Sequence, residues 1–510
     1  MSSASKTTCI QLSPEDNVAV AVQAIQLGQR IEQLNLSCRQ SIPSGHKVAV
    51  NAIEKGQAIR KYNQIIGFAS SDIAPGDHVH THNCSMGDFT RDYAFCVDAD
   101  PRRAVRPEGL TFDGYRRATG KAGTRNFLGL VTTVNCAGTV ANLVAEKVRE
   151  EKLLADYPNI DGIVPLTHGS GCGMAGQGEP FEMLGRTLQG YATHPNFAGV
   201  LVLGLGCEVM QVAGFLKEYD LKKSDSFRAF TIQSSKGTRR TVADCLGTIR
   251  EMLPQADAAR REAIPVSELV LALQCGGSDA WSGVSANPAL GYAADRLVAN
   301  GGTVILSETP EIYGAEHLLT RRAVSREVGE KLIERIQWWE RYTRRNDMEM
   351  NNNPSPGNKE GGLTTILEKS LGAVAKSGTS DLAEVYLYAE PVRKRGLVFM
   401  DSPGFDPCSI TGQVASGANI ICFTTGRGSV YGYKPAPSIK LASNSTVYNR
   451  MQEDMDINCG TIVDGDSTVA EKGDEIFEYI VSVASGAASK SELLGFGGCE
   501  FVPWQTGAVM

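Results

Sequence analysis

Three of the chain's seven histidines lie within one short stretch. His78, His80 and His82 alternate with other residues, and side chains at positions i, i+2 and i+4 of a strand project from the same face. Neutral imidazole is a common ligand of iron, zinc, copper and nickel. The spacing therefore predicts a strand face that binds a metal or takes part in acid–base chemistry. The alternative is a polar, exposed strand.

A glycine-rich turn at 167–176 holds His168 and Cys172. The turn follows an apolar run, precedes a helical pattern and matches G-x-G-x-x-G, the fingerprint of dinucleotide-binding loops. That fingerprint also requires an acidic residue about 20 positions further on, at the end of the next strand, and none is found there. The turn is better interpreted as a ligand-binding or catalytic loop, and an NAD-dependent oxidoreductase is the less favoured alternative.

The chain has 13 cysteines, and four of them follow apolar runs of strand length. Parallel sheets bind ligands at the rim formed by the carboxyl ends of their strands, and thiolates suit iron, zinc and iron–sulfur clusters. No Cys-x-x-Cys pair occurs, so a zinc ribbon is not expected. The pattern predicts either an iron site on one rim or thiols that only pack beneath loops. The four are Cys136, Cys172, Cys207 and Cys275.

Two segments combine glycine with a cation, 353–362 around Lys359 and 424–429 around Arg427. Exposed backbone N–H groups together with Lys or Arg form a cradle for a carboxylate or a phosphate. Neither segment has the P-loop pattern, so an NTPase is not supported. The alternative for each segment is an ordinary turn.

The bulk composition excludes several classes of protein. The 510 residues are 42% hydrophobic and 21% charged, which is ordinary for a folded protein, and the net charge is −7. No basic block suggests nucleic-acid binding, no apolar run is long enough to cross a membrane, and the N-terminus lacks the apolar core of a secretory signal. We expect a cytoplasmic protein with reduced thiols and no nucleic-acid or membrane partner.

The elements that position these residues divide along the chain. Residues 1–97 contain three Ile-x-x-Gly steps beside short β-branched stretches, which predicts a small β-rich domain with tight turns. A charged linker with two prolines follows at 98–110.

From 111 to 346, apolar runs of strand length alternate with helical patterns and end in a long helix near 325–345. This alternation predicts a mostly parallel, Rossmann-like sheet covered on both faces. An Asn-, Pro- and Gly-rich loop at 347–362 then separates this domain from a smaller α/β domain at 363–510. The predicted fold class is α/β, with a small β-rich domain followed by two α/β domains.

Several segments together resemble the altronate/galactarate dehydratase family of sugar-acid dehydratases, over nearly the whole chain. Residues 1–97 look like that family's SAF-type domain, and the histidine segment 78–83 matches its altronate branch. Segments 376–378 and 455–458 look like the galactarate branch instead. The histidine segment makes altronate the expected substrate, and these two segments keep galactarate as the alternative. The other matching segments are 114–116, 123–126, 204–208, 275–279, 286–288, 353–362 and 425–428.

The resemblance implies a hydro-lyase that removes the proton α to a carboxylate and the β-hydroxyl group, giving a 2-keto-3-deoxy acid. It implies Fe²⁺, or Mn²⁺ in its place, and the cysteine rim adds an iron–sulfur cluster as an alternative. A carbon–sulfur lyase acting on a sulfonated hydroxy acid is a second reading within the family. Large α/β metabolic enzymes are often symmetric, so a homo-oligomer, a dimer, is expected.

These expectations assign a role to each candidate residue. The catalytic candidates are His82, His168, Glu208 and Asp279; the metal ligands are His80, His82, Cys136, Cys172, Cys207 and Cys275; the substrate-binding candidates are Arg125, Asn126, Ser278, Asn287, Lys359 and Arg427.

Overall fold

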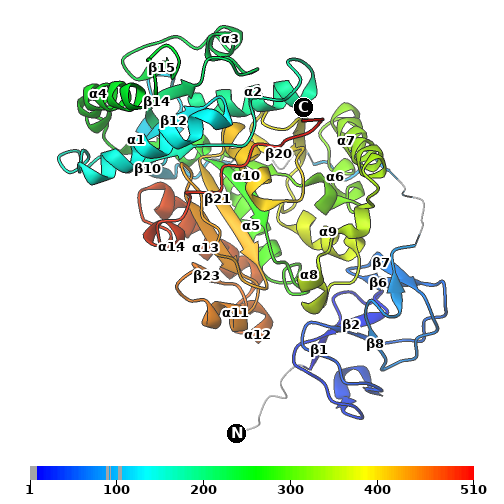
Figure 1. Cartoon of the computed structure of the whole chain (residues 1–510). Coiled ribbons are helices and arrows are strands. Elements are labelled where there is room, and N and C mark those ends of the chain that lie inside the picture. Colours follow the sequence, from blue (N-terminus) through cyan, green and yellow to red (C-terminus); the bar gives the residue numbers. More distant parts are fainter. Residues whose placement is uncertain (1–7, 88–90, 92, 101–105, 510) are drawn as a thin grey trace.

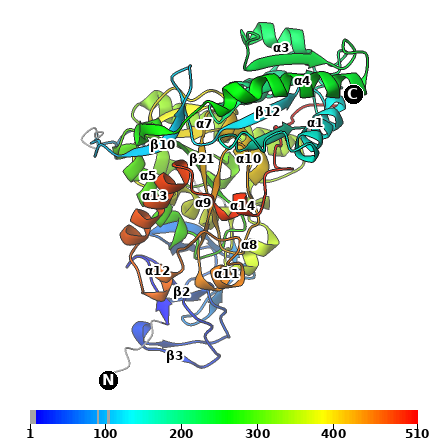
Figure 2. The same cartoon turned by 90° about the vertical axis from the view of Figure 1, so that its left-hand side faces the viewer.

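The computed structural model describes residues 8–87, 91, 93–100 and 106–509, and its elements form three regions (Figure 1). A strand-rich N-terminal module lies at one end, a region with a large parallel sheet lies in the middle, and a second parallel sheet lies at the other end (Figure 2). The predicted fold class is confirmed, with β structure first and parallel α/β structure after it. No helix in the described part of the chain has both the length and the apolar character needed to cross a membrane.

The N-terminal module consists of short antiparallel strands joined by tight turns. Gly45, Gly56 and Gly76 end the three Ile-x-x-Gly steps and have φ values of +81°, +85° and +87°, a conformation that glycine adopts without strain. The strands form a four-stranded sheet of β1 (Cys9–Ile10), β2 (Val18–Ala21), β5 (Lys47–Ala49) and β8 (His78–Val79), a three-stranded sheet of β6 (Ala58–Lys61), β7 (Gln64–Ala69) and β9 (Cys84–Ser85), and the pair β3 (Arg30–Ile31) and β4 (Leu36–Ser37).

The second region is a four-stranded parallel sheet in the order β13-β12-β14-β15. Leu128 and Leu130 of β12 pack toward α1 and α4, whereas Val131 belongs to the core on the α2 side, so both faces are covered as predicted. Its elements are β12 (Phe127–Thr132), α1 (Gly138–Glu150), β13 (Gly162–Leu166), α2 (Glu179–Ala192), β14 (Phe197–Gly204), α3 (Val212–Glu218), β15 (Phe227–Thr231) and α4 (Thr238–Asp257). The flanking antiparallel strands are β10 (Thr111–Arg116), β11 (Ala122–Gly123) and β16 (Glu262–Pro265).

The third region holds a seven-stranded parallel sheet in the order β19-β20-β18-β17-β21-β22-β23. Its strands are β17 (Val270–Cys275), β18 (Thr303–Leu306), β19 (Leu382–Tyr386), β20 (Gly396–Met400), β21 (Ile420–Thr425), β22 (Ser438–Ala442) and β23 (Ile457–Asn458). Its helices are α5 (Ala286–Ala299), α6 (His317–Thr320), α7 (Arg326–Arg345), α8 (Pro356–Glu360), α9 (Ile366–Ala375), α10 (Asp406–Ala415), α11 (Ser445–Arg450), α12 (Thr461–Asp464), α13 (Val469–Ala484) and α14 (Lys490–Leu493).

The division between the two α/β domains differs from the prediction. Strands β17 and β18 fall inside the predicted 111–346 domain, yet they pair with β20 and β21 in the seven-stranded sheet. The loop 347–362 therefore lies within one domain, between α7 and α9, and the change of sheet comes at about residue 260. Alternating strands and helices look alike on both sides of such a change, so the pattern alone does not show which sheet a strand joins.

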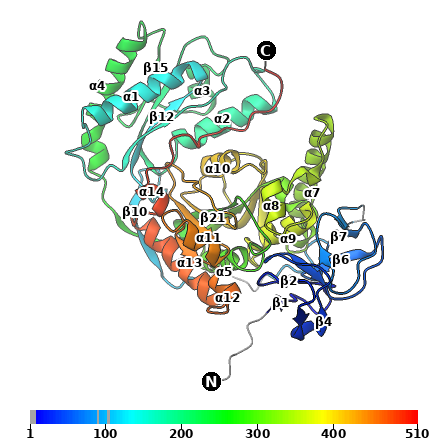
Figure 3. The same cartoon turned by 60° about the horizontal axis from the view of Figure 1, so that its bottom comes forward.

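The regions pack closely against one another. Helix α2 lies beside α10 (Figure 3), and a Cβ at Gly190 of α2 would collide with the backbone of Ala415. Part of the predicted linker, 101–105, lies outside the described residues. Its described ends rest on the third region, where Asp98 pairs with Arg321 at 2.6 Å.

Candidate functional site

The order of the seven strands has one reversal, between β17 and β21. From β17 the chain adds strands on one side, and it then returns to add β21, β22 and β23 on the other. In open parallel sheets, ligands bind in the crevice outside the carboxyl ends of the strands at such a reversal. The loops that leave β17 and β21 there are 275–279 and 425–428, two of the segments singled out from the sequence.

A cavity of about 270 Å³ lies at this point. Val22 and Ser44 of the N-terminal module line one side of it, so the cavity lies between that module and the seven-stranded sheet. The polar and charged residues that line the sheet side include Asp279, Glu360, Arg427, Asn444, Arg450 and Asp464.

Asp279 holds the loops of this cavity together. Its Oδ1 accepts hydrogen bonds from the backbone N and Oγ of Ser282, both at 2.9 Å, and from Oγ of Ser443 at 2.8 Å. Its Oδ2 accepts one from Nδ2 of Asn444 at 3.0 Å. Burial raises the pKa of the Asp279 carboxyl, and these four donors oppose the rise. Because the carboxylate is engaged this fully, the geometry favours a positioning role over the predicted acid–base role.

Two guanidinium groups lie beside the cavity. Nη2 of Arg427 contacts Oε2 of Glu360 at 3.0 Å, and the Arg427 side chain is 44% exposed. Nη2 of Arg450 donates to the carbonyl oxygen of Arg427 at 2.9 Å. Arg427, which the sequence predicted to bind a carboxylate, therefore lies at the cavity. Lys359, the other predicted cation, lies on α8 outside the residues that line the cavity.

The histidine cluster includes a residue that the sequence reasoning missed. His46, His78 and His80 place one ring nitrogen each within 4.8 Å of the others. Strands β5 and β8 pair with Lys47 opposite Val79, and the same register brings His46 opposite His80. His82 lies outside this trio, with its ring centroid 5.3 Å from that of His78. A signal was present, since His46 stands in a glycine turn directly before an alternating strand.

The predicted alternating strand through the histidines is wrong beyond Val79. Strand β8 ends there, and Asn83 folds the chain back by accepting from the His80 amide at 2.9 Å and donating to the His78 carbonyl at 2.9 Å. Asparagine readily makes such local turns. The histidines therefore meet through a turn and a neighbouring strand, rather than along one strand face.

The histidine trio fits a metal ion. Burial lowers the pKa of His78 to about 4 and that of His80 to about 3, so the rings are neutral near pH 7. Nδ1 of His80 is buried and has no hydrogen-bond partner among the described residues. Neutral imidazoles with a buried, unpartnered nitrogen are the donor set that divalent iron, zinc or nickel prefers.

A buried ion cluster holds the trio beside the cavity. Nζ of Lys47 contacts Glu368 of α9 at 2.9 Å and the Gly362 carbonyl at 2.7 Å, and Nζ of Lys61 contacts Glu368 at 3.0 Å. The neighbouring His46 places Nε2 3.2 Å from the carbonyl oxygen of Glu360, a residue that lines the cavity.

A second polar cluster is buried at the centre of the same rim. Sγ of Cys275 lies 3.3 Å from Oε2 of Glu311 and 2.8 Å from Nζ of Lys376, and Glu308 completes a possible metal-binding group. Lys369 contacts Glu311 at 2.7 Å, so two ammonium groups already neutralise these acids. Of the two groups, the neutral histidines thus suit a cation better. The sequence reasoning found only Cys275 here, because the other four lie far from it in the chain.

The pKa values of the acids in and beside this cluster are shifted in different directions. Burial and the neighbouring Glu311 raise the pKa of Glu308, while Lys369 and Lys376 outweigh burial and lower the pKa of Glu311. Burial and Glu311 also raise the pKa of Asp406 to about 7. Glu308 has φ +70°, a strained value for a residue other than glycine, and its Oε1 has no partner among the described residues.

The four cysteines predicted to share one rim are divided between two. Cys136, Cys172 and Cys207 are exposed on the loops after β12, β13 and β14 of the four-stranded sheet. Cys275 is buried at the end of β17, in the other sheet. All four do follow strand ends, as predicted, but a strand end in the sequence does not identify its sheet.

His168 and Glu208 are held by the backbone of these loops. His168 is buried, with Nε2 donating to the Thr132 carbonyl at 2.9 Å and Nδ1 accepting from the Ser170 amide at 3.2 Å. Glu208 accepts from the amides of Leu205 and Gly206 at 3.2 and 2.5 Å. Their predicted catalytic roles conflict with this geometry, because neither side chain is free for a substrate.

Three of the predicted substrate-binding residues also have structural partners. Arg125 is buried and paired with Glu492 at 2.6 Å. Asn126 precedes β12, at the opposite edge of its sheet, and donates to the carbonyls of Asn159 and Ala256.

Asn287 bridges the Gly372 carbonyl and the Thr424 hydroxyl. Ser278 is buried in the loop between Cys275 and Asp279, where its carbonyl accepts from Asn358 at 2.8 Å.

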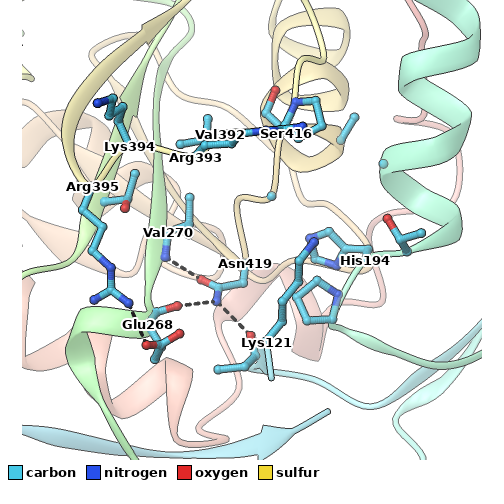
Figure 4. A pocket seen from close by; sticks show the side chains of 18 of the residues that line it. Lys121, His194, Glu268, Val270, Val392, Arg393, Lys394, Arg395, Ser416 and Asn419 are labelled. Carbon is cyan, nitrogen blue, oxygen red and sulfur yellow. Dashed lines mark hydrogen bonds and ion pairs between the residues drawn. The ribbon is translucent and has the colours of Figure 1, made fainter. Parts of the chain in front are cut away.

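Another cavity, of about 220 Å³, lies at the opposite edge of the seven-stranded sheet (Figure 4). There Arg395 pairs with Glu268 at 2.8 Å, and Asn419 joins the Ala122 carbonyl to the amide of Val270. The amino ends of β17, β18 and β21 lie at this edge, away from the strand-order reversal. This cavity is therefore not the candidate catalytic site.

Comparison with known proteins matches each of the three regions to a family model. Residues 7–87 match an altronate/galactarate dehydratase SAF domain, residues 114–257 the second domain of D-galactarate dehydratase/altronate hydrolase, and residues 266–509 the C-terminal domain of D-galactarate/altronate dehydratase. The last two ranges are separated where the chain passes from one sheet to the other.

Curated relatives match along most of the chain. A galactarate dehydratase (L-threo-forming) of Escherichia coli (strain K12) is 40% identical over 94% of this chain and 92% of its own length. An altronate dehydratase of Bacillus subtilis (strain 168) is 36% identical over 94% and 95%. A (2R)-sulfolactate sulfo-lyase subunit beta of Chromohalobacter salexigens is 33% identical over 76% and 96%.

Proposed function

Since the chain belongs to the D-galactarate/altronate dehydratase family of sugar-acid dehydratases, we propose that it removes water from altronate or galactarate. The proton on the carbon next to the carboxylate and the hydroxyl group on the following carbon leave. The resulting enol then takes a proton from solvent and becomes a 2-keto-3-deoxy acid.

The observation that supports this proposal most strongly is the cavity at the strand-order reversal. Arg427 and Arg450 offer cations for a carboxylate, and Thr446, which lines the same cavity, offers a hydroxyl group for a polyhydroxy chain. A guanidinium binds a carboxylate through two parallel hydrogen bonds, which fixes its orientation. Asp279 keeps the loops in place through its four hydrogen bonds.

We infer that the reaction depends on a divalent metal, Fe²⁺ first and Mn²⁺ as the alternative, held by His46, His78 and His80. Such a metal would act as a Lewis acid that makes the α-proton easier to remove. The docking of the module through Lys47 and Glu368 keeps these histidines beside Glu360.

Glu360 is the best candidate for the base. Its carboxylate lines the cavity and pairs with Arg427, whereas Asp279 has every oxygen engaged. When a substrate carboxylate takes the Arg427 guanidinium, the Glu360 carboxylate is released from that ion pair beside the substrate. A base must reach its proton within hydrogen-bond distance, and Glu360 lines the same cavity as Arg427.

Two features of the chain favour different substrates, altronate and galactarate. The histidine segment favours altronate, through its resemblance to that branch. Galactarate has a carboxylate at each end, and the second guanidinium, that of Arg450, offers a partner for it. Measuring kcat/KM for both acids under the same conditions decides between them.

Elimination of sulfite from a sulfonated hydroxy acid is the second candidate, favoured by the 33% identity to the sulfolactate lyase subunit. The same proton would be removed, but sulfite would leave instead of water. The relatives with that activity are named as separate alpha and beta subunits, whereas this chain unites the N-terminal module with the two larger regions. That difference favours dehydration.

The test uses anaerobically purified full-length protein loaded with Fe²⁺ and a panel of aldonates, aldarates and sulfolactate. We expect a 2-keto-3-deoxy acid from altronate or galactarate and no sulfite. His46→Ala should lower both bound Fe²⁺ and kcat, and His317→Ala, a partly buried histidine outside the trio, is the matched control. Absence of turnover with every acid would refute the proposed function.

A further inference from the structure

We propose that Cys136, Cys172 and Cys207 bind a cubane iron–sulfur cluster at the carboxyl edge of the four-stranded sheet. The inference rests on the three loops themselves and stands apart from the identity of the substrate. Only a direct part for the cluster in dehydration would rest on the proposed function.

The three loops that carry these cysteines are joined by their backbones. The amide of Asn135, next to Cys136, donates to the Ser170 carbonyl at 3.0 Å. The carbonyl of Gly171, next to Cys172, accepts from the amides of Val209 and Met210 at 3.0 and 3.2 Å, just beyond Cys207. Strands β13 and β14 both pair with β12, so the loops also leave from neighbouring positions. The three loops therefore form one connected edge of the sheet, and each of them carries one of the thiols.

These thiols are exposed, unlike most cysteines of the chain. Free cysteine is among the residue types most often buried, and eight of the other described cysteines are buried. Packing in the core does not explain three exposed thiols on three loops that contact one another. Thiolates are the ligands that hold iron–sulfur clusters in proteins. The buried cysteines are Cys9, Cys38, Cys84, Cys245, Cys275, Cys408, Cys422 and Cys459.

Residues around the thiols give the loops a fixed shape. His168 joins the Cys172 loop to the end of β12, and Glu208 closes the turn that holds Cys207. Gly171 has φ +94°, and a Cβ there would collide with the Thr133 carbonyl. Gly206 has φ +122°. Together these contacts hold the three loops in fixed positions, as preorganised ligands require.

The three thiols are not grouped as the ligands of a single ion would be. The three Sγ atoms do not all lie within 4.8 Å of one another, the limit that the histidine trio meets. In a tetrahedral site with metal–sulfur bonds of about 2.3 Å, sulfur ligands would be about 3.8 Å apart. A cubane binds each thiolate on a different iron, so its ligands stand further apart. Because Cys275 belongs to the other sheet, three thiolates leave the fourth iron without a cysteine ligand.

The experiment measures iron, acid-labile sulfide and the visible absorption of the full-length protein, purified or reconstituted without oxygen. We expect roughly four labile sulfides per chain, as a cubane requires, and roughly four irons in addition to any iron at the histidine trio. Cys136→Ser, Cys172→Ser and Cys207→Ser should each reduce labile sulfide to background. Cys96→Ser, which removes a partly exposed thiol beside Thr320 of the third region, should leave it unchanged. Far-UV circular dichroism confirms that each variant is folded.

Reconstituted protein without labile sulfide, or three serine variants that retain the sulfide of the parent, would overturn the proposal. The proposed function is tested separately. Turnover of a sugar acid by protein that takes up no labile sulfide on reconstitution would overturn the cluster proposal and leave the proposed dehydratase function intact. Full sulfide content without turnover of any acid would support the cluster and refute the proposed dehydratase function.

Discussion

Arg427 is the residue on which substrate binding depends most. It is half-exposed in the cavity, and its partner Glu360 is itself exposed, so a substrate carboxylate can take the place of Glu360 at little cost. Hydrogen bonds to charged groups contribute about 1.5–3 kcal/mol, and 1.4 kcal/mol corresponds to about tenfold in affinity.

We therefore expect Arg427→Gln to raise the KM for the sugar acid by about tenfold to 100-fold in steady-state kinetics. Arg345→Gln, at the exposed end of α7, removes the same charge far from the cavity and should leave KM unchanged. An unaltered KM in Arg427→Gln would rule out the carboxylate clamp.

His168 makes folding stability depend on pH. Burial lowers its pKa from 6.5 to about 4, so between these values the unfolded chain binds a proton that the folded chain does not. The free energy of unfolding is complete above pH 6.5 and decreases as the pH falls toward 4. The size of the loss for this one group is on the order of 3 kcal/mol.

His168→Gln should flatten this dependence, as measured by the urea midpoint at pH 7 and pH 4.5. An equally steep dependence in His168→Gln would show that His168 is not the group that titrates.

Residue types in the sequence predicted the location of candidate site residues better than their roles. The sequence led to Asp279 and Arg427, which line the cavity, to His80, which belongs to the histidine trio, and to three cysteines exposed on one rim. The roles of His168, Glu208 and Arg125 stay predictions. The geometry does not favour them, because these side chains already have partners among backbone groups and among residues far along the chain. His46 was missed because only the pairing of β5 with β8 brings it to the other histidines.

At the scale of elements, the reversal between β17 and β21 creates the cavity. Strands and helices were predictable because apolar runs and helical periodicity are local: the helix expected near 325–345 is α7, at Arg326–Arg345. Membership of a sheet is not local. The loop 347–362 has the composition of a linker, yet it is inserted between helices of one domain and brings Glu360 to the cavity.

The crossing of α2 and α10 joins the second and third regions through small residues. A Cβ at Gly190 would collide with the Ala415 carbonyl, and backbone does not move aside as a flexible side chain can. We expect Gly190→Ala to destabilise the protein by about 1–3 kcal/mol through overpacking. Thermal unfolding measures the change.

Gly247→Ala is the matched control for this prediction. Gly247 lies inside α4, and a Cβ there would meet nothing within 4 Å. It should stabilise the protein by up to about 1 kcal/mol, as alanine is the better helix former. Equal changes in thermal stability for Gly190→Ala and Gly247→Ala would contradict the close contact between α2 and α10.

In the whole molecule, the N-terminal module supplies the histidines and the sheet supplies the cavity. Their alignment depends on Glu368, which is fully buried between Lys47 and Lys61. The two ammonium groups outweigh burial and lower the pKa of Glu368, so its contribution to stability is present at neutral pH and is lost only in strong acid.

Glu368→Gln should cost about 3–5 kcal/mol, because it leaves two buried lysines without a carboxylate. Hydrogen exchange should speed up in β5 and β7 more than in β12, since the change frees the module from the third region. Glu334→Gln, at an exposed position of α7, should change neither rate nor stability. Unchanged exchange in the module would contradict this view of its docking.

The proton-transfer step can be observed directly by running the reaction in D₂O with altronate and galactarate and recording the product by mass spectrometry and NMR at early times. The proposed mechanism predicts a 2-keto-3-deoxy acid with one solvent deuterium on the carbon that lost its hydroxyl group. Product formed without deuterium there, or no product from either acid, would contradict it.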